Sequence, residues 1–248
     1  MTGVGDIALL AAAGVLAGLV GSAGAITSLV SYPALLVVGL PALSANVTNL
    51  VAAVACWPGA ALASQPELVG KGSWLRRWIP LSALGGAGGA VLLLVTPPGV
   101  FARVVPFLVA LGSLALLAQP WLAARRDGAG GVALPVGLVG TAVYGGYFGA
   151  GSGVMTLALL LITTEPRLAS ANALKNMLIG AQVLVSAVAF GFFGPVDWAA
   201  AAALGLGMFV GSTLGPGITR RVPAAPLRWV VAAIGFGLAV QLWVDPSA

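Results

Sequence analysis

A lysine between two asparagines, inside an apolar segment, is the residue group in this chain best suited to bind a small anion. Asn172, Lys175 and Asn176 are spaced so that they share one face of a helix. The ammonium and the carboxamides supply hydrogen-bond donors, and the ammonium adds positive charge. A charge at membrane depth is costly and usually marks the path of a solute.

A glycine-rich break precedes this group. It reads Gly145-Gly-Tyr-Phe-Gly-Ala-Gly-Ser-Gly-Val-Met155 and interrupts an apolar region. Glycines stop a helix there without forming a soluble loop, and non-helical backbone at membrane depth is tolerated only against protein or a watery cavity. The free N–H groups of a helix that begins after such a break favour an anion. Ser152 and Gly153 therefore join the predicted site.

A second copy of the pattern occurs earlier in the chain. Gly21-Ser-Ala-Gly24 precedes an apolar run and the segment Ser44-Ala-Asn-Val-Thr-Asn49. The offset from Gly21 to Gly149 is 128 residues, and that from Asn49 to Asn176 is 127. Glycine-interrupted apolar segments at matching positions of two halves are the best sequence pointer to a transporter's binding site.

The first copy contributes five residues to the predicted substrate site: Ser22, Gly24, Asn46, Thr48 and Asn49. Helical rise puts Lys175 about 13.5 Å beyond Pro166 and Asn49 about 12 Å beyond Pro41, against a half-core of about 15 Å. The two polar clusters are therefore expected to meet near the bilayer midplane. Thr48 occupies the place that Lys175 holds in the other copy, so one positive charge serves the site.

Composition defines the elements that must position these residues. Hydrophobic residues make up 60% of the chain and charged residues 7%, with a mean hydropathy of +1.07. Soluble domains carry about 25% charged residues. The sequence therefore predicts an all-α polytopic membrane protein with no separate soluble domain. The net charge of +5 is not interpreted as nucleic-acid binding, because the basic residues lie in short loops between apolar segments.

The predicted architecture is two inverted-topology repeats, residues 1–120 and 132–248, joined by a cytoplasmic linker at 121–131 into one integral-membrane domain. Each repeat begins with a glycine-broken helical hairpin whose arms are short for a span. The hairpin arms are Ile7–Val20 with Ile26–Leu40, and Val132–Phe148 with Val154–Ile162. Three transmembrane helices follow each hairpin: Leu43–Ala63, Trp74–Val95 and Val100–Leu117, then Leu168–Phe193, Trp198–Gly215 and Pro226–Trp243.

Charge and small residues support this arrangement. If each hairpin enters and leaves on one side, nine of the eleven Lys and Arg residues face the cytoplasm, Arg103 lies outside and Lys175 lies in the membrane. Both termini are then extracytoplasmic, and the repeats are inverted. Glycines spaced by four, at Gly207, Gly211 and Gly215, predict a helix-packing seam, which matches Gly85 to Gly89 in role.

The sequence lacks the residues that several other functions would need. The chain has no histidine and one cysteine, so a histidine-based triad, an internal disulfide and a multi-thiolate metal site are not expected. No cofactor, metal or enzymatic activity is predicted. No Asp or Glu falls well inside a span, so a buried carboxylate proton relay is absent as well. Cys56 is interpreted as a small core residue, and Trp57, like most of the tryptophans, as an interfacial anchor.

The two motifs together resemble the sulfite exporter TauE/SafE family. Tyr147-Phe-Gly-Ala-Gly-Ser-Gly153 with Asn172-Ala-Leu-Lys-Asn176 looks like that family's second half. Pro41–Asn49 resembles its first repeat, and Gly211–Pro223 fits its late segment, so the resemblance covers nearly the whole chain. It implies a multi-pass permease of the bacterial inner membrane that exports sulfite, an organosulfonate or a related sulfur oxyanion. The expected partners are this anion and membrane lipid; a homodimer stays open, and nucleic acid is not expected.

Other interpretations stay open at this point. Glycines at hairpin tips can be packing devices, membrane asparagines can bond a neighbouring helix, and Lys175 can snorkel towards the cytoplasmic interface. A membrane-embedded enzyme or assembly factor is the alternative from another class, and a channel for another small solute is a third. The sequence does not choose among coupling through the substrate's own protonation, an ion site, or a passive gradient.

Overall fold

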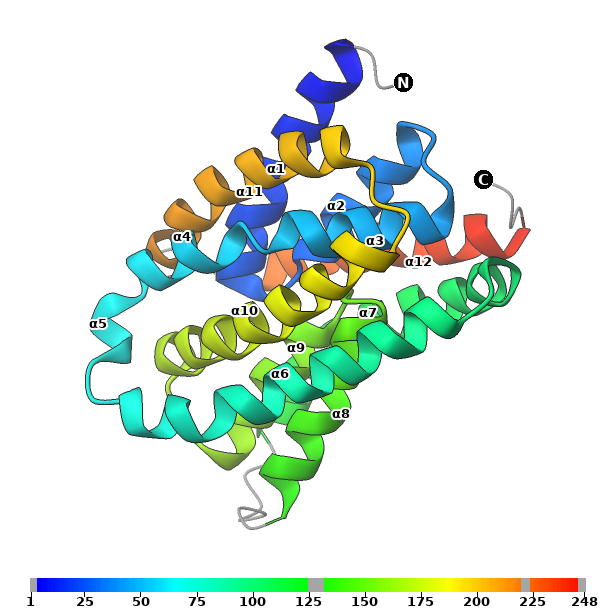
Figure 1. The fold of residues 1–248 in the computed structure, drawn as a ribbon. Helices are drawn as coiled ribbons and strands as arrows, with labels where there is room; N and C mark the ends of the chain where they lie inside the picture. Colours follow the sequence, from blue (N-terminus) through cyan, green and yellow to red (C-terminus); the bar gives the residue numbers. More distant parts are fainter. Residues whose placement is uncertain (1–3, 125–131, 220–223, 245–248) are drawn as a thin grey trace.

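The computed structural model describes residues 4–124, 132–219 and 224–244, and these are helical with no strand among them. The helices of the first half are α1 (Val4–Gly24), α2 (Thr27–Val37), α3 (Ala42–Ala53), α4 (Cys56–Ala63), α5 (Gln65–Leu68), α6 (Gly72–Val95) and α7 (Pro98–Ala124) (Figure 1). Those of the second half are α8 (Ala133–Tyr147), α9 (Ser152–Thr163), α10 (Leu168–Phe193), α11 (Trp198–Thr219) and α12 (Ala224–Val244).

Six apolar stretches in the described residues are long enough to cross a membrane. They are Val4–Ser22, Ala42–Ala63, Gly72–Val95, Pro98–Ala118, Leu168–Phe193 and Trp198–Gly215. Five of these coincide with predicted crossings, and α12 covers the sixth predicted one. The prediction of an all-helical, multi-pass membrane protein is confirmed.

The first hairpin differs from the predicted one. Gly21 and Gly24 lie inside α1, and the chain turns only at Ala25, whose φ is +68°. As a result α1 has 21 residues instead of a short arm, whereas α2 has 11. In the second half the turn falls where predicted, with Gly149 and Gly151 at φ of +85° and +86°, which glycine adopts without a Cβ penalty.

The span that holds Asn46 and Asn49 is broken in its middle. Val54 and Ala55 form a turn between α3 and α4, and the amide of Trp57 donates to the carbonyl of Val54, three residues back. Pro58 accounts for this, because it has no N–H to offer the Val54 carbonyl and its ring disfavours regular helix there. The matching span of the second half, α10, runs unbroken for 26 residues.

Each hairpin packs its first arm, in parallel, against a helix of the other half. Gly14 and Gly18 of α1 contact Leu204 and Met208 of α11, and a Cβ at Gly211 would collide with the Val15 carbonyl. Likewise α8 packs on α6, where Gly85 contacts Ala142, Gly89 contacts Val143 and Gly146 contacts Gly86. Small residues bring the backbones together, so the predicted glycine seams are confirmed. The two halves therefore interlock.

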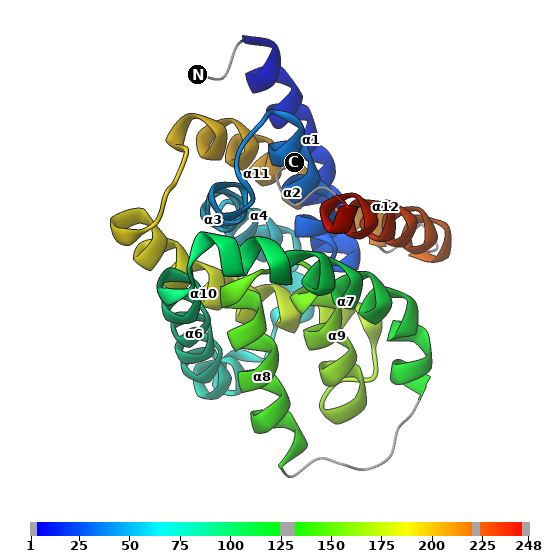
Figure 2. The same ribbon diagram turned by 90° about the vertical axis from the view of Figure 1, so that its right-hand side faces the viewer.

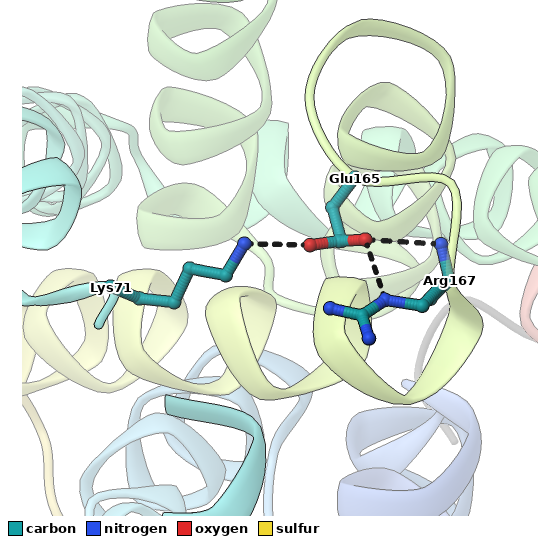
Figure 3. Close-up of polar contacts among 3 residues, drawn as sticks. All are labelled: Lys71, Glu165 and Arg167. Atoms are coloured by element: carbon teal, nitrogen blue, oxygen red, sulfur yellow. Dashed lines mark hydrogen bonds and ion pairs between the residues drawn. The ribbon is translucent and has the colours of Figure 1, made fainter. Parts of the chain in front are cut away.

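Polar contacts join loops at both ends of α10. Before its first residue, Glu165 accepts a hydrogen bond of 2.7 Å from Lys71 and lies 3.3 Å from Arg167 Nε (Figure 3). This bond from Lys71 holds the pKa of Glu165 below its usual value. Beyond its last residue, Pro195 accepts a 2.7 Å bond from Ser44 at the start of α3. The α5–α6 and α2–α3 connections therefore lie at opposite ends of α10.

The predicted linker is partly helical. The helix α7 continues through Gln119 and Trp121 to Ala124, beyond the predicted end of that span at Leu117. The rest of the linker, residues 125–131, lies outside the described residues, as do Arg220 and Arg221 of the predicted cytoplasmic charge cluster.

Candidate functional site

A cavity of about 70 Å³ lies where the two hairpin turns meet the two polar spans. A cavity of this size holds several waters or one small anion. Its polar lining includes Ser22, Thr27, Ser28, Ser152, Lys175 and Asn176. Its remaining lining is apolar or glycine, from the hairpin turns and from α3, α4 and α10. The structure thus brings both copies of the sequence motif into one site.

Lys175 is the charged residue of this lining, with 2% of its surface exposed. Its Nζ donates to the carbonyl oxygen of Gly21, 3.2 Å away, in the last turn of α1. The Gly21 carbonyl also accepts from the amide of Ala25 at 2.8 Å, so Lys175 uses the second lone pair of that oxygen. The last carbonyls of a helix carry the negative end of its dipole. This end of α1 therefore offsets part of the cost of burying the ammonium, while other N–H directions of Lys175 are left for a ligand.

The two asparagines beside Lys175 contact the same turn. Asn172 Nδ2 donates to the Ser22 carbonyl at 2.6 Å, and Asn176 Nδ2 lies 3.5 Å from the same oxygen. Asn176 lines the cavity, and Asn172 lies behind it. Asn46 makes the equivalent contact in the other half, donating at 2.9 Å to the carbonyl of Tyr147 at the end of α8. Each polar span thus holds the first hairpin arm of the other half.

The second arms of both hairpins begin at the cavity. Thr27 and Ser28 open α2, Ser152 and Gly153 open α9, and all four line the cavity. The residues that precede these helices are Ile26 and Gly151, neither of which has a side-chain oxygen to cap the first N–H groups. The two turns touch, because a Cβ at Gly153 would lie 2.7 Å from the Ala25 carbonyl. Two positive helix ends therefore converge on one small space.

Asn49 and Thr48, two further residues of the predicted site, do not line the cavity. Asn49 is buried behind α2, with Oδ1 2.5 Å from the hydroxyl of Ser31. Thr48 faces another way, because its Oγ1 accepts from the amide of Asp197 at 3.0 Å. Although Thr48 matches Lys175 in the repeat, the structure does not bring it to the cavity. Gly24 is the last residue of α1.

Sequence reasoning missed the apolar wall. Cys56 and Trp57 line the cavity from α4, and Gly180 and Val183 line it from α10. Trp57 therefore faces the cavity, where its position in the sequence had suggested an interfacial anchor. Cys56 packs, partly buried, against the core as predicted, and it also lines the cavity. The signal that could have found them is Pro58, since a proline in the middle of a span marks a break where side chains can face a cavity.

No group of three His, Cys, Asp or Glu side chains that could hold a metal occurs in the described residues. Cys56 is the one soft ligand in the lining, and the cavity's other donors are hydroxyls, amides and an ammonium. This donor set suits an anion better than a metal cation.

Comparison with known proteins agrees with this architecture. The family model described as Sulfite exporter TauE/SafE matches residues 7–242. A curated protein from Sinorhizobium sp, named "Probable membrane transporter protein ORF9", is 26% identical over 251 residues, which cover 97% of this chain and 94% of that protein. No solved structure matches. The chain therefore belongs to the sulfite exporter TauE/SafE family of membrane transporters.

Proposed function

We propose that the protein carries a small sulfur oxyanion, sulfite or an organosulfonate, out of a bacterial cell across the inner membrane. The observation that carries the proposal is Lys175, a buried ammonium in a cavity to whose lining the described residues contribute no carboxylate. A bound anion would supply the countercharge that the ammonium lacks, and a charge-assisted hydrogen bond is among the stronger ones. The family name, which refers to sulfite, agrees with an anionic substrate.

The donor groups around Lys175 suit an oxyanion with several oxygens. The first residues of α2 and α9 line the cavity from the two hairpins, and Asn176 lines it from α10. An anion between them would contact both halves at once. Binding and release can then be linked to a relative movement of the halves, as in transporters whose site lies between two repeats.

We further propose that the two repeats are inverted. In both views, α1 and α8 begin at opposite ends of the molecule (Figures 1 and 2). The exchange of helix pairs, α1 with α11 and α8 with α6, is the pattern expected when a two-fold axis relates the halves. Lys71 and Arg167 also contact the same carboxylate, as they would if both loops faced the cytoplasm. Inverted repeats allow one site to open alternately to either side.

Flux into proteoliposomes tests the transport proposal. Sulfite, sulfoacetate, sulfate and thiosulfate are offered side by side to purified wild-type protein, with empty liposomes, acetate and glycerol as controls. Saturable flux of at least one sulfur oxyanion, well above acetate, supports it. Equal passage of glycerol and sulfite would indicate a channel for small solutes. Absence of flux for all four sulfur oxyanions would remove sulfur oxyanions as the substrate class.

A further inference from the structure

We propose that the indole of Trp57 sets the upper size of the anion that the cavity accepts. This inference rests on the proposed transport function and adds a specificity-determining residue to it. Trp57 differs from the polar residues of the site, because it offers a large rigid surface rather than a charge. Its role would be to exclude bulky anions, whereas Lys175 and the helix ends attract all anions.

The break in the α3–α4 span places Trp57 at the cavity. Without an N–H at Pro58, the backbone tightens over residues 54–57, and the amide of Trp57 bonds to the Val54 carbonyl at 3.1 Å. Cys56 and Trp57, the first two residues of α4, both line the cavity, although neighbouring residues on a regular helix diverge by about 100°. Trp57, the largest side chain of the lining, is thus the sequence neighbour of the thiol of Cys56.

Gly180 on α10 leaves space for the indole ring of Trp57. A Cβ at Gly180 would collide with Cδ1 and Cγ of the Trp57 indole, so only glycine allows the ring to lie this close to α10. Gly180 follows Lys175 by five residues, or about 7.5 Å along the helix axis. The indole therefore forms a wall of the cavity that Lys175 also lines, and it is held from two sides by the α4 backbone and by α10. A side chain held in this way has little freedom to move aside for a larger ligand.

The wall assignment can be tested without knowing the substrate, because Cys56 is the chain's single cysteine. Purified wild type, Trp57→Phe and Trp57→Ala are treated with two anionic thiol reagents, the small 2-sulfonatoethyl methanethiosulfonate and a bulky disulfonated stilbene maleimide. We expect the bulky-to-small ratio of Cys56 modification rates to rise roughly tenfold or more in Trp57→Ala, with Trp57→Phe between. Trp198→Ala, which removes a tryptophan that is 60% exposed, should keep the wild-type ratio.

Flux gives the second readout. In the same variants, the rate for benzenesulfonate relative to sulfite should rise roughly tenfold in Trp57→Ala and less in Trp57→Phe. An unchanged labelling ratio in both Trp57 variants overturns the inference, and so does a Cys56 that stays unreactive towards both reagents in every variant. If labelling shifts as expected but wild type carries no sulfur oxyanion, the proposed substrate is rejected and the size-limiting role of Trp57 is retained. If sulfite is carried and labelling does not shift, only the size-limiting role of Trp57 is rejected.

Discussion

The ammonium of Lys175 lies 3.2 Å from the carbonyl oxygen of Gly21, a residue 154 positions away in the other half of the chain. This single bond joins the polar span of one half to the end of the first hairpin arm of the other. It also means that Lys175 has a structural partner even without substrate. Charge and hydrogen bonding at this position must therefore be separated by experiment.

Lys175→Gln separates them, because glutamine keeps an N–H donor for the Gly21 carbonyl while it removes the charge. We expect thermal stability close to wild type and a fall in affinity for the transported anion of roughly 10- to 100-fold, from a lost charged hydrogen bond of about 1.5–3 kcal/mol. Isothermal titration and proteoliposome flux measure the effect. Lys71→Gln, which removes a lysine that does not line the cavity, is the matched control for flux. Wild-type flux in Lys175→Gln would disprove the role of the charge.

The ion pair of Lys71 and Glu165 should make stability depend on pH. Because the Lys71 hydrogen bond lowers the pKa of Glu165, the stabilisation is fully present above the ordinary glutamate value of about 4.3 and is lost as pH falls through the lower folded-state value. Lys71 is 31% exposed, so we expect no more than about 1 kcal/mol. Glu165→Gln should lower the melting temperature at pH 7, and the difference from wild type should shrink below pH 4. A difference that stays constant from pH 7 to pH 3 would contradict this assignment.

Gly207→Ala should destabilise the protein by about 1–3 kcal/mol, because its new Cβ would collide with the Ala11 carbonyl where α1 and α11 pack. Gly205→Ala on the same helix is the control. Its Cβ would approach nothing closer than 3.4 Å, and alanine favours the helix. Thermal unfolding in detergent, followed by size-exclusion chromatography, measures both. Equal melting temperatures for the two variants would show that the seam tolerates wider helix spacing.

The proposed inverted topology predicts that two exposed valines are labelled from opposite sides of the membrane. Val69 precedes the loop of Lys71, and Val37 ends α2 near the other end of α10; they are 80% and 76% exposed. In a Cys56→Ser background, we expect Val69→Cys to react with an impermeant maleimide only from the cytoplasm and Val37→Cys only from outside. Right-side-out and inverted vesicles provide the two accessibilities. Labelling of both positions from the same side would exclude the proposed topology.

The membrane class, most span positions, the second hairpin and the glycine seams could be predicted from the amino-acid sequence. These follow from local properties: apolar length sets a span, paired glycines set the second turn, and spacing by four puts small residues on one face. Lys175 was predictable for a related reason, since a lone charge within a long apolar run is conspicuous wherever the helix lies.

Which polar residues face the cavity depends on how distant segments of the chain pack. Thr48 matches Lys175 in the repeat, yet it bonds to Asp197, because the chain outside the motif differs between the halves. Gly21 stays helical because α11 packs on α1 and supports it through the glycines. Trp57 reaches the cavity because Pro58 breaks the span and Gly180, more than 120 residues later, leaves space for the ring. Such placements depend on how closely the backbones of distant segments approach each other. A local pattern of residues does not predict that distance.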